Sequence, residues 1–172
     1  MRWMNKSLTA FALLIALLVF EVAHSAYYYP KLPARMASHF AGDGHANGWS
    51  GKPAFFVVHL ATLAGTAALL STIGWIMPWF PKSTVNLPHK EYWLSEQQAA
   101  KTYAVLSAQM MWFAAGTVAF FIGLGHLVFR ANLLPQPRLS DGVWWLLVGY
   151  LAFTTIWCAG LLVRFARRPR DA

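Results

Sequence analysis

The sequence predicts an all-α integral membrane protein with four transmembrane helices and a compact extracytoplasmic loop between the first two. Four apolar segments each hold about 20 or more residues, enough to cross a hydrocarbon core roughly 30 Å thick. Only 12% of the residues are charged and 58% are hydrophobic. The apolar runs also lack the period-two alternation of a transmembrane strand. We therefore expect one domain over residues 1–172, with helices at about 8–28, 55–77, 103–129 and 143–163.

The first apolar segment also has features of a secretory signal. Arg2 and Lys6 precede the apolar run Leu8–Phe20, and small residues follow at Ala23–Ala26, which together are typical of a cleavable leader. The apolar run continues into three tyrosines at Tyr27–Tyr29, and such an aromatic belt is typical of a retained helix end. We interpret the segment as an uncleaved first helix.

Two patterns in the later helices concern packing and helix starts. Ser95 followed by Gln98 is a capping-box pattern, which predicts the start of the third helix. Small residues allow close helix packing in membranes. They occur on the second helix at Ala61, Gly65 and Ala68, and on the third at Gly116 and Gly123.

The net charge of +8 is distributed unevenly between the two sides of the predicted bundle. With four spans, the tails and the middle loop share one side, which holds nine of the 14 Lys and Arg residues against five on the other. The positive-inside rule places both termini in the cytoplasm. We expect the Arg-rich C-terminus to meet anionic lipid headgroups rather than nucleic acid. Its basic residues are Arg164, Arg167, Arg168 and Arg170.

The loop after the first helix is rich in prolines and turn residues, which predicts a compact structure. Pro30 and Pro33 end the helix, and Gly42–Gly44 and Asn47–Gly48 are turn sequences. Met36 and Phe40 fit a short element, either helix or strand. We expect an ordered cap on the bundle, with His39 at least partly buried and Trp49 at the membrane interface.

Motif residues in this loop resemble a bacterial membrane domain of unknown function, which also forms the N-terminal part of SdpI-type peptide-toxin immunity proteins. The resemblance covers roughly residues 8–100. It implies a short four-helix member in the bacterial inner membrane, and a fold more strongly than a function. Gly51 is an insertion relative to the usual pattern, and the longer immunity proteins have further C-terminal helices. The motif comprises Leu32-Pro33, Ser38-His39-Phe40, Gly44, Asn47-Gly48-Trp49 and Lys52. The candidate ligand- or partner-binding residues are His39, Asp43, Gly44, Gly48, Trp49 and Lys52.

Four ionisable residues are expected at one depth in the membrane. Glu21 lies 13 residues after Leu8, or roughly 20 Å along the first helix, and His24 is one turn further on the same face. His59 is about 9 Å below Pro53, and His126 is one turn before Arg130. The outer third of the bilayer would hold all four.

An intramembrane ionisable residue is costly and therefore a functional candidate. One interpretation is a polar network in which Glu21 pairs with His24 or Arg130. A second is a transition-metal or haem site formed by Glu21, His24, His59 and His126, since imidazole binds zinc, copper and iron. A third is proton or solute handling. The single cysteine, Cys158, allows neither an intramolecular disulfide nor a cysteine metal motif.

These observations leave three classes of function. The first is a non-enzymatic membrane protein that binds a partner, senses a ligand or acts as an accessory subunit of a larger complex. The second is a metal- or haem-binding, redox-associated subunit. The third is a membrane enzyme or transporter, which the absence of a nucleophile motif, phosphate loop or paired-carboxylate site disfavours.

Overall fold

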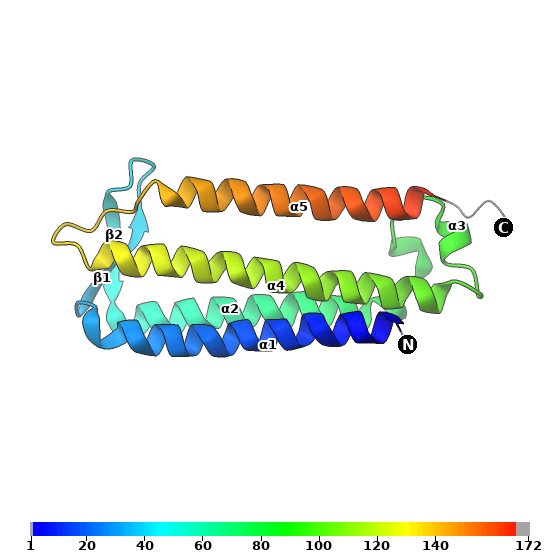
Figure 1. The fold of residues 1–172 in the computed structure, drawn as a ribbon, viewed down its shortest axis with the longest axis horizontal. Coiled ribbons are helices and arrows are strands. Elements are labelled where there is room, and N and C mark those ends of the chain that lie inside the picture. The colour runs from blue at the N-terminus through cyan, green and yellow to red at the C-terminus, as the bar shows by residue number, and fades with distance from the viewer. Residues whose placement is uncertain (1, 168–172) are drawn as a thin grey trace.

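The computed structural model describes residues 2–167 as a mostly helical bundle with a small antiparallel sheet at one end (Figure 1). Four helices are long and apolar enough to cross a membrane, as the sequence predicts. The elements in chain order are α1 (Arg2–Tyr28), the 3₁₀ turn η1 (Tyr29–Lys31), β1 (Arg35–Phe40), β2 (Ala46–Gly51), α2 (Lys52–Ile76), η2 (Met77–Trp79), η3 (Lys82–Thr84), α3 (Lys90–Trp93), α4 (Ala99–Asn132) and α5 (Gly142–Ala166).

The two ends of the bundle differ. The strands β1 and β2 form a hairpin at one end, which we call the hairpin end (Figure 1). The short helix α3 lies at the opposite end, where α1 begins and α5 ends. The loop between α1 and α2 is therefore a β-structure, and the all-α expectation is wrong for this segment.

Helix α4 is the central element, because it packs against α1, α2 and α5. Its residues Ala114, Ala115 and Val118 are almost fully buried. They pack with Leu14 of α1 and with Leu63 of α2 in the middle of the bundle. Only Phe165 is buried on α5, so α1, α2 and α4 form the bundle core and α5 is attached to its outside.

Helix α4 is also longer than the expected range 103–129, because both of its ends are packed. Tyr103 near its start lies in a cluster with Leu94 and Phe165, and Phe129 near its end lies in a cluster under the hairpin. The helix begins after Gln98, which makes no side-chain cap hydrogen bond. The carbonyl of Ser95 instead accepts hydrogen bonds from the amides of Gln98 and Ala99 at 3.1 and 2.9 Å, so the predicted capping box is a turn.

Small residues permit close packing on α4 but not at the expected positions of α2. A Cβ at Gly116 would meet the ring of Phe153, and a Cβ at Gly123 would lie 3.0 Å from Leu146 of α5. Gly65, by contrast, has no neighbour within 4 Å. The prediction for Ala61, Gly65 and Ala68 is wrong, since these residues lie on the exposed side of α2. Leu63, Ala67 and Gly74 are the buried positions of that helix.

The hairpin pairs Met36 with Ser50 and Ala37 with Trp49, and its register shifts between Ala37 and Phe40. Its turn contains Gly44 at a φ of +84°, a conformation that favours glycine. The carbonyl of Gly44 accepts a hydrogen bond of 2.9 Å from the amide of Leu139. The turn is thereby attached to the segment between α4 and α5.

Two contacts hold β1 on the bundle. Met36 is fully buried in a cluster with Tyr28, Phe56 and Phe129. The buried side chain of Asn132 accepts a 2.7 Å hydrogen bond from the amide of Ala37 and donates a 3.0 Å bond to its carbonyl. Because an amide side chain satisfies both backbone groups, it replaces a missing strand neighbour.

The register shift after Ala37 changes which residues of the hairpin are buried. Met36 and Ala37 are both buried, and Ser38 and His39 are both exposed. The expectation that His39 is partly buried is therefore wrong, because the register shift after Ala37 turns it away from the bundle. The His39 ring instead hydrogen-bonds the Asn47 side chain on β2.

Replacing Asn132 with alanine should loosen the hairpin without unfolding the helices. The change removes two bonds to Ala37 and leaves buried backbone groups unpaired, which costs about 1–3 kcal/mol. Hydrogen exchange at the Ala37 amide should accelerate by about tenfold or more. Leu133→Ala, at the exposed neighbouring position, is the control. Unchanged exchange at Ala37 in Asn132→Ala would show that the side chain does not hold the strand.

Candidate functional site

Glu21 is a buried carboxyl group within a membrane-spanning helix, with 1% of its surface exposed. His24 and Ser25 lie one turn further along α1 on the same face, because residues three and four apart are neighbours on a helix. Ser25 Oγ donates to Glu21 Oε1 at 2.9 Å. Nδ1 of His24 lies 3.0 Å from Glu21 Oε2. Helix α1 thus supplies the carboxyl group and two of its partners.

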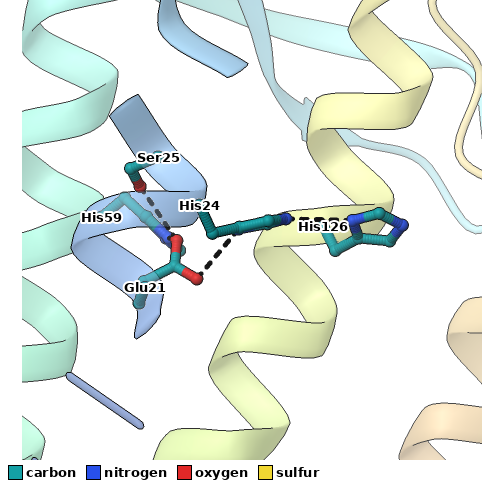
Figure 2. Close-up of polar contacts among 5 residues, drawn as sticks. All are labelled: Glu21, His24, Ser25, His59 and His126. Carbon is teal, nitrogen blue, oxygen red and sulfur yellow. Dashed lines mark hydrogen bonds and ion pairs between the residues drawn. The ribbon is translucent and has the colours of Figure 1, made fainter. Parts of the chain in front are cut away.

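The other two core helices complete the network. His59 of α2 places Nε2 at 2.7 Å from Glu21 Oε1. His126 of α4 places Nδ1 at 3.1 Å from Nε2 of His24. Figure 2 shows the α1 residues between the histidines of α2 and α4. The structure thus brings together the four side chains that the sequence placed at one depth. We call Glu21, His24, Ser25, His59 and His126 the Glu–His network.

The hydrogen bonds determine the tautomers for the state in which Glu21 is a carboxylate and the three histidines are neutral. A carboxylate only accepts hydrogen bonds, so His59 donates from Nε2 and His24 donates from Nδ1. Nε2 of His24 then has a lone pair and accepts from Nδ1 of His126. Each hydrogen bond in the network then has one donor and one acceptor. The nitrogens left over, Nδ1 of His59 and Nε2 of His126, are acceptors, and neither bonds any group in residues 7–167.

Aromatic rings enclose the network. His24 contacts the rings of Phe20, Tyr28 and Phe129, with centroids 4.9–5.6 Å apart. His59 stacks on Phe55 and meets Phe129 edge-on. Such walls lower the local dielectric constant, which strengthens each hydrogen bond and raises the cost of losing one. Glu21 is stabilised in the membrane because three donors converge on it.

Gly125 makes room for His59. A Cβ at this position would lie 2.9 Å from Nε2 of His59 and closer still to its Cε1. The imidazole therefore crosses the surface of α4 where that helix has no side chain. Sequence reasoning missed this residue and Ser25. The available signals were a glycine directly before His126 and a hydroxyl four residues after Glu21.

The arrangement is a branched chain of pairwise hydrogen bonds. His24 uses both of its nitrogens, one toward Glu21 and one toward His126. In the part of the chain that the structure describes, no group of three or more His, Cys, Asp or Glu side chains is arranged to hold a metal ion. Metal binding by Glu21, His24, His59 and His126 would require these bonds to break and the donors to turn toward one point.

The six candidate residues of the first loop have separate positions. Lys52 Nζ donates to the carbonyls of Tyr29 and Leu32 at 3.1 and 2.8 Å, and Asp43 Oδ1 accepts from the amide of His45 at 3.0 Å. Gly44 forms the turn, and a Cβ at Gly48 would lie 2.8 Å from that of His39. These four residues shape the hairpin. Whether the set binds a ligand or partner stays a prediction.

Trp49 remains largely outside the packing of the hairpin. Its surface is 43% exposed, and the Arg35 guanidinium lies 5.6 Å from its ring centroid. A cation over an aromatic face is attracted by the ring quadrupole. The hairpin therefore displays an exposed pair formed by Arg35 of β1 and Trp49 of β2, and Met36 and Asn132 hold β1 on the bundle.

A cavity of about 450 Å³ lies beneath the hairpin, between α2 and α4. We call it the hairpin cavity. Its walls are mostly apolar, and His59 is among the residues that line it. Its other lining residues include Ser38, Ser50, Phe55, Val58, Phe121 and Gly125.

The family comparison supports the sequence interpretation in part. Residues 14–63 match the model of a domain of unknown function, DUF1648. The match covers α1 from Leu14, the hairpin and the first half of α2. It therefore includes Glu21, His24 and His59 but not His126. No curated protein and no solved structure matches the chain.

Gly125→Ala should destabilise the protein, although alanine is normally the better helix former. The new methyl group would displace the His59 ring from Glu21, which costs about 1–3 kcal/mol. Gly65→Ala, on an open face of α2, is the matched control and should be neutral or stabilising by up to about 1 kcal/mol. Unfolding in mixed detergent micelles measures both. Equal effects of the two substitutions would contradict the assigned packing.

Proposed function

We propose that the protein is a non-enzymatic subunit of the bacterial inner membrane that binds a partner, in a sensing or accessory role. The observation that carries the proposal is the Arg35–Trp49 pair, which is exposed on a hairpin fixed to the bundle. Tryptophan and arginine are the residue types that most often dominate binding energy at interfaces. Because the two strands are paired and β1 is held on the bundle, little conformational entropy is lost when the hairpin binds.

The Glu–His network supports a sensing role beneath that surface. It joins α1, α2 and α4 at the hairpin end, where a partner on the hairpin would lie. Ionisable groups within a membrane are costly and are typically functional. The motif residues of the hairpin also favour a relation to the N-terminal part of SdpI-type immunity proteins, as proteins of similar fold.

The proposed orientation places the hairpin outside the cytoplasm. The sequence divides the basic residues nine to five between the two sides of the predicted topology, and the richer side is expected to face the cytoplasm. The Arg-rich C-terminus would then meet anionic headgroups on the inner leaflet. Arg164 and Arg167 are at the end of α5, while Arg168 and Arg170 lie outside the described residues.

Single cysteines should report this orientation. Ser38 is exposed on β1 at the hairpin end, and Ser83 is exposed on η3, in the connection between α2 and α3. Introduced separately into a Cys158→Ser background, Ser38→Cys should react with an impermeant thiol reagent in intact cells. Ser83→Cys should react only after the cells are opened. Labelling of both from outside would contradict the proposed topology.

Photo-cross-linking should identify a partner at the hairpin. Benzoylphenylalanine in place of Trp49 should give a discrete protein adduct in intact cells, since this side chain lies on the proposed contact surface. Arg35→Ala in the same background should reduce the adduct. Benzoylphenylalanine in place of Trp79, which is 69% exposed near the opposite end, is the control. Adducts with lipid alone, or the same adduct from both positions, would refute the proposal.

The alternative function, a metal- or haem-binding redox subunit, makes a different prediction, which concerns the purified protein. Protein purified without chelators would carry stoichiometric zinc, copper, iron or haem. That metal would be lost in His24→Ala, because His24 is central to the network. Elemental analysis and absorption spectra distinguish this outcome from partner binding.

A further inference from the structure

We propose that the hairpin cavity binds an apolar, membrane-soluble molecule whose hydroxyl group donates a hydrogen bond to Nδ1 of His59. The site is distinct from the Arg35–Trp49 surface, and the proposal does not depend on a protein partner. It rests on hydrogen-bonding groups of the cavity that have no partner, on the carboxyl group of Glu21 next to His59, and on the apolar lining of the cavity.

The first argument is the unpaired nitrogen of His59. Nε2 bonds Glu21 at 2.7 Å, which leaves Nδ1 as an acceptor when Glu21 is a carboxylate and His59 is neutral. Among the described residues, Nδ1 has no hydrogen-bond partner. His59 lines the cavity, so a ligand there can supply the missing donor. The carboxylate behind the ring makes the imidazole a better acceptor, as it does for histidines that bind metals.

The second argument concerns the charge of the ligand. Glu21 lies on the other side of the His59 ring, so an anionic group at Nδ1 would be repelled. Lys, Arg, Asp and Glu are absent from the residues that line the cavity, and an ion would therefore be bound without a counter-charge. An uncharged donor avoids both costs.

The third argument is a second unused polar atom in the same cavity. Ser50 lines the cavity, and its Oγ is buried without a hydrogen-bond partner. Buried polar atoms are normally paired. With the Ser50 side chain turned toward the cavity, its hydroxyl would pair with the oxygen of a hydroxyl-bearing ligand whose hydrogen is donated to His59.

The walls and position of the cavity indicate that the rest of the ligand is apolar and membrane-soluble. Phe55, Val58 and Phe121 make the lining apolar, and a volume of about 450 Å³ is in the range of small-molecule sites. Val58 is 66% exposed on the outer face of α2, within the apolar span Lys52–Trp79. Because the cavity borders this membrane-facing surface, the ligand would enter from the lipid phase.

A pair of phenols tests the hydrogen bond. The protein in lipid nanodiscs, with isotope-labelled histidine, is titrated with para-butylphenol and separately with its methyl ether, which lacks the donor. The phenol should bind about fivefold to tenfold more tightly, and the nitrogen NMR signal of His59 Nδ1 should move to lower frequency. Equal binding of the two compounds, or an unchanged Nδ1 signal at saturation, would overturn the proposal.

Two neighbouring valines provide matched variants that do not touch the Glu–His network. Val58 lines the cavity and Val57 does not, although the two are 66% and 68% exposed. Val58→Phe should fill the cavity and weaken phenol binding by about tenfold or more, while Val57→Phe should leave it unchanged. Equal loss in both variants, or no loss in Val58→Phe, would show that the phenol dissolves in lipid or binds elsewhere.

Discussion

Glu21 places a carboxyl group in the apolar interior of the bundle, with 1% of its surface exposed. A carboxylate in an apolar bundle is stable only if hydrogen-bond donors replace the water it has lost. Three donors reach Glu21, from Ser25, His24 and His59. Since one of them comes from α2, the carboxyl group links α1 to α2. These two helices make little other direct contact, because both pack mainly on α4.

Helix α4 connects this network to the hairpin. Gly125, His126, Phe129 and Asn132 lie within its last eight residues. Gly125 admits the His59 ring, and His126 supports His24 from the other side. Phe129 packs against His24 and His59, and it belongs to the cluster that buries Met36. Asn132 then holds the backbone of Ala37. The hairpin and the network are therefore joined by one short, packed segment of helix.

The sequence was sufficient to predict what depends on length and depth. Apolar run length predicts four spans, and a rise of about 1.5 Å per residue places Glu21, His24, His59 and His126 at one level. Their contact also depends on the rotation of each helix, which spacing does not give. Gly125 shows why: the close approach of His59 depends on a missing side chain in another helix.

Local patterns were less reliable where tertiary contacts decide the outcome. The bulge between Ala37 and His39 reverses the expected burial of His39. Asn132 satisfies the Ala37 backbone over a sequence separation that a local motif cannot reveal. The stripe of Ala61, Gly65 and Ala68 has the composition of a packing face but lies on the open side of α2. Composition identifies residues that permit close packing, and only the fold determines which of them are used.

The polar contacts of the network and the hairpin are divided between the segment that matches the family model and α4. The segment that matches the family model supplies Glu21, His24, Ser25, His59 and the hairpin. On its own it would leave Nε2 of His24 and both backbone groups of Ala37 without their partners, which α4 provides. Unpaired polar groups are especially costly in lipid, where water cannot replace a lost partner. The segment therefore needs a third helix with suitably placed polar side chains, and α4 provides it here through His126 and Asn132.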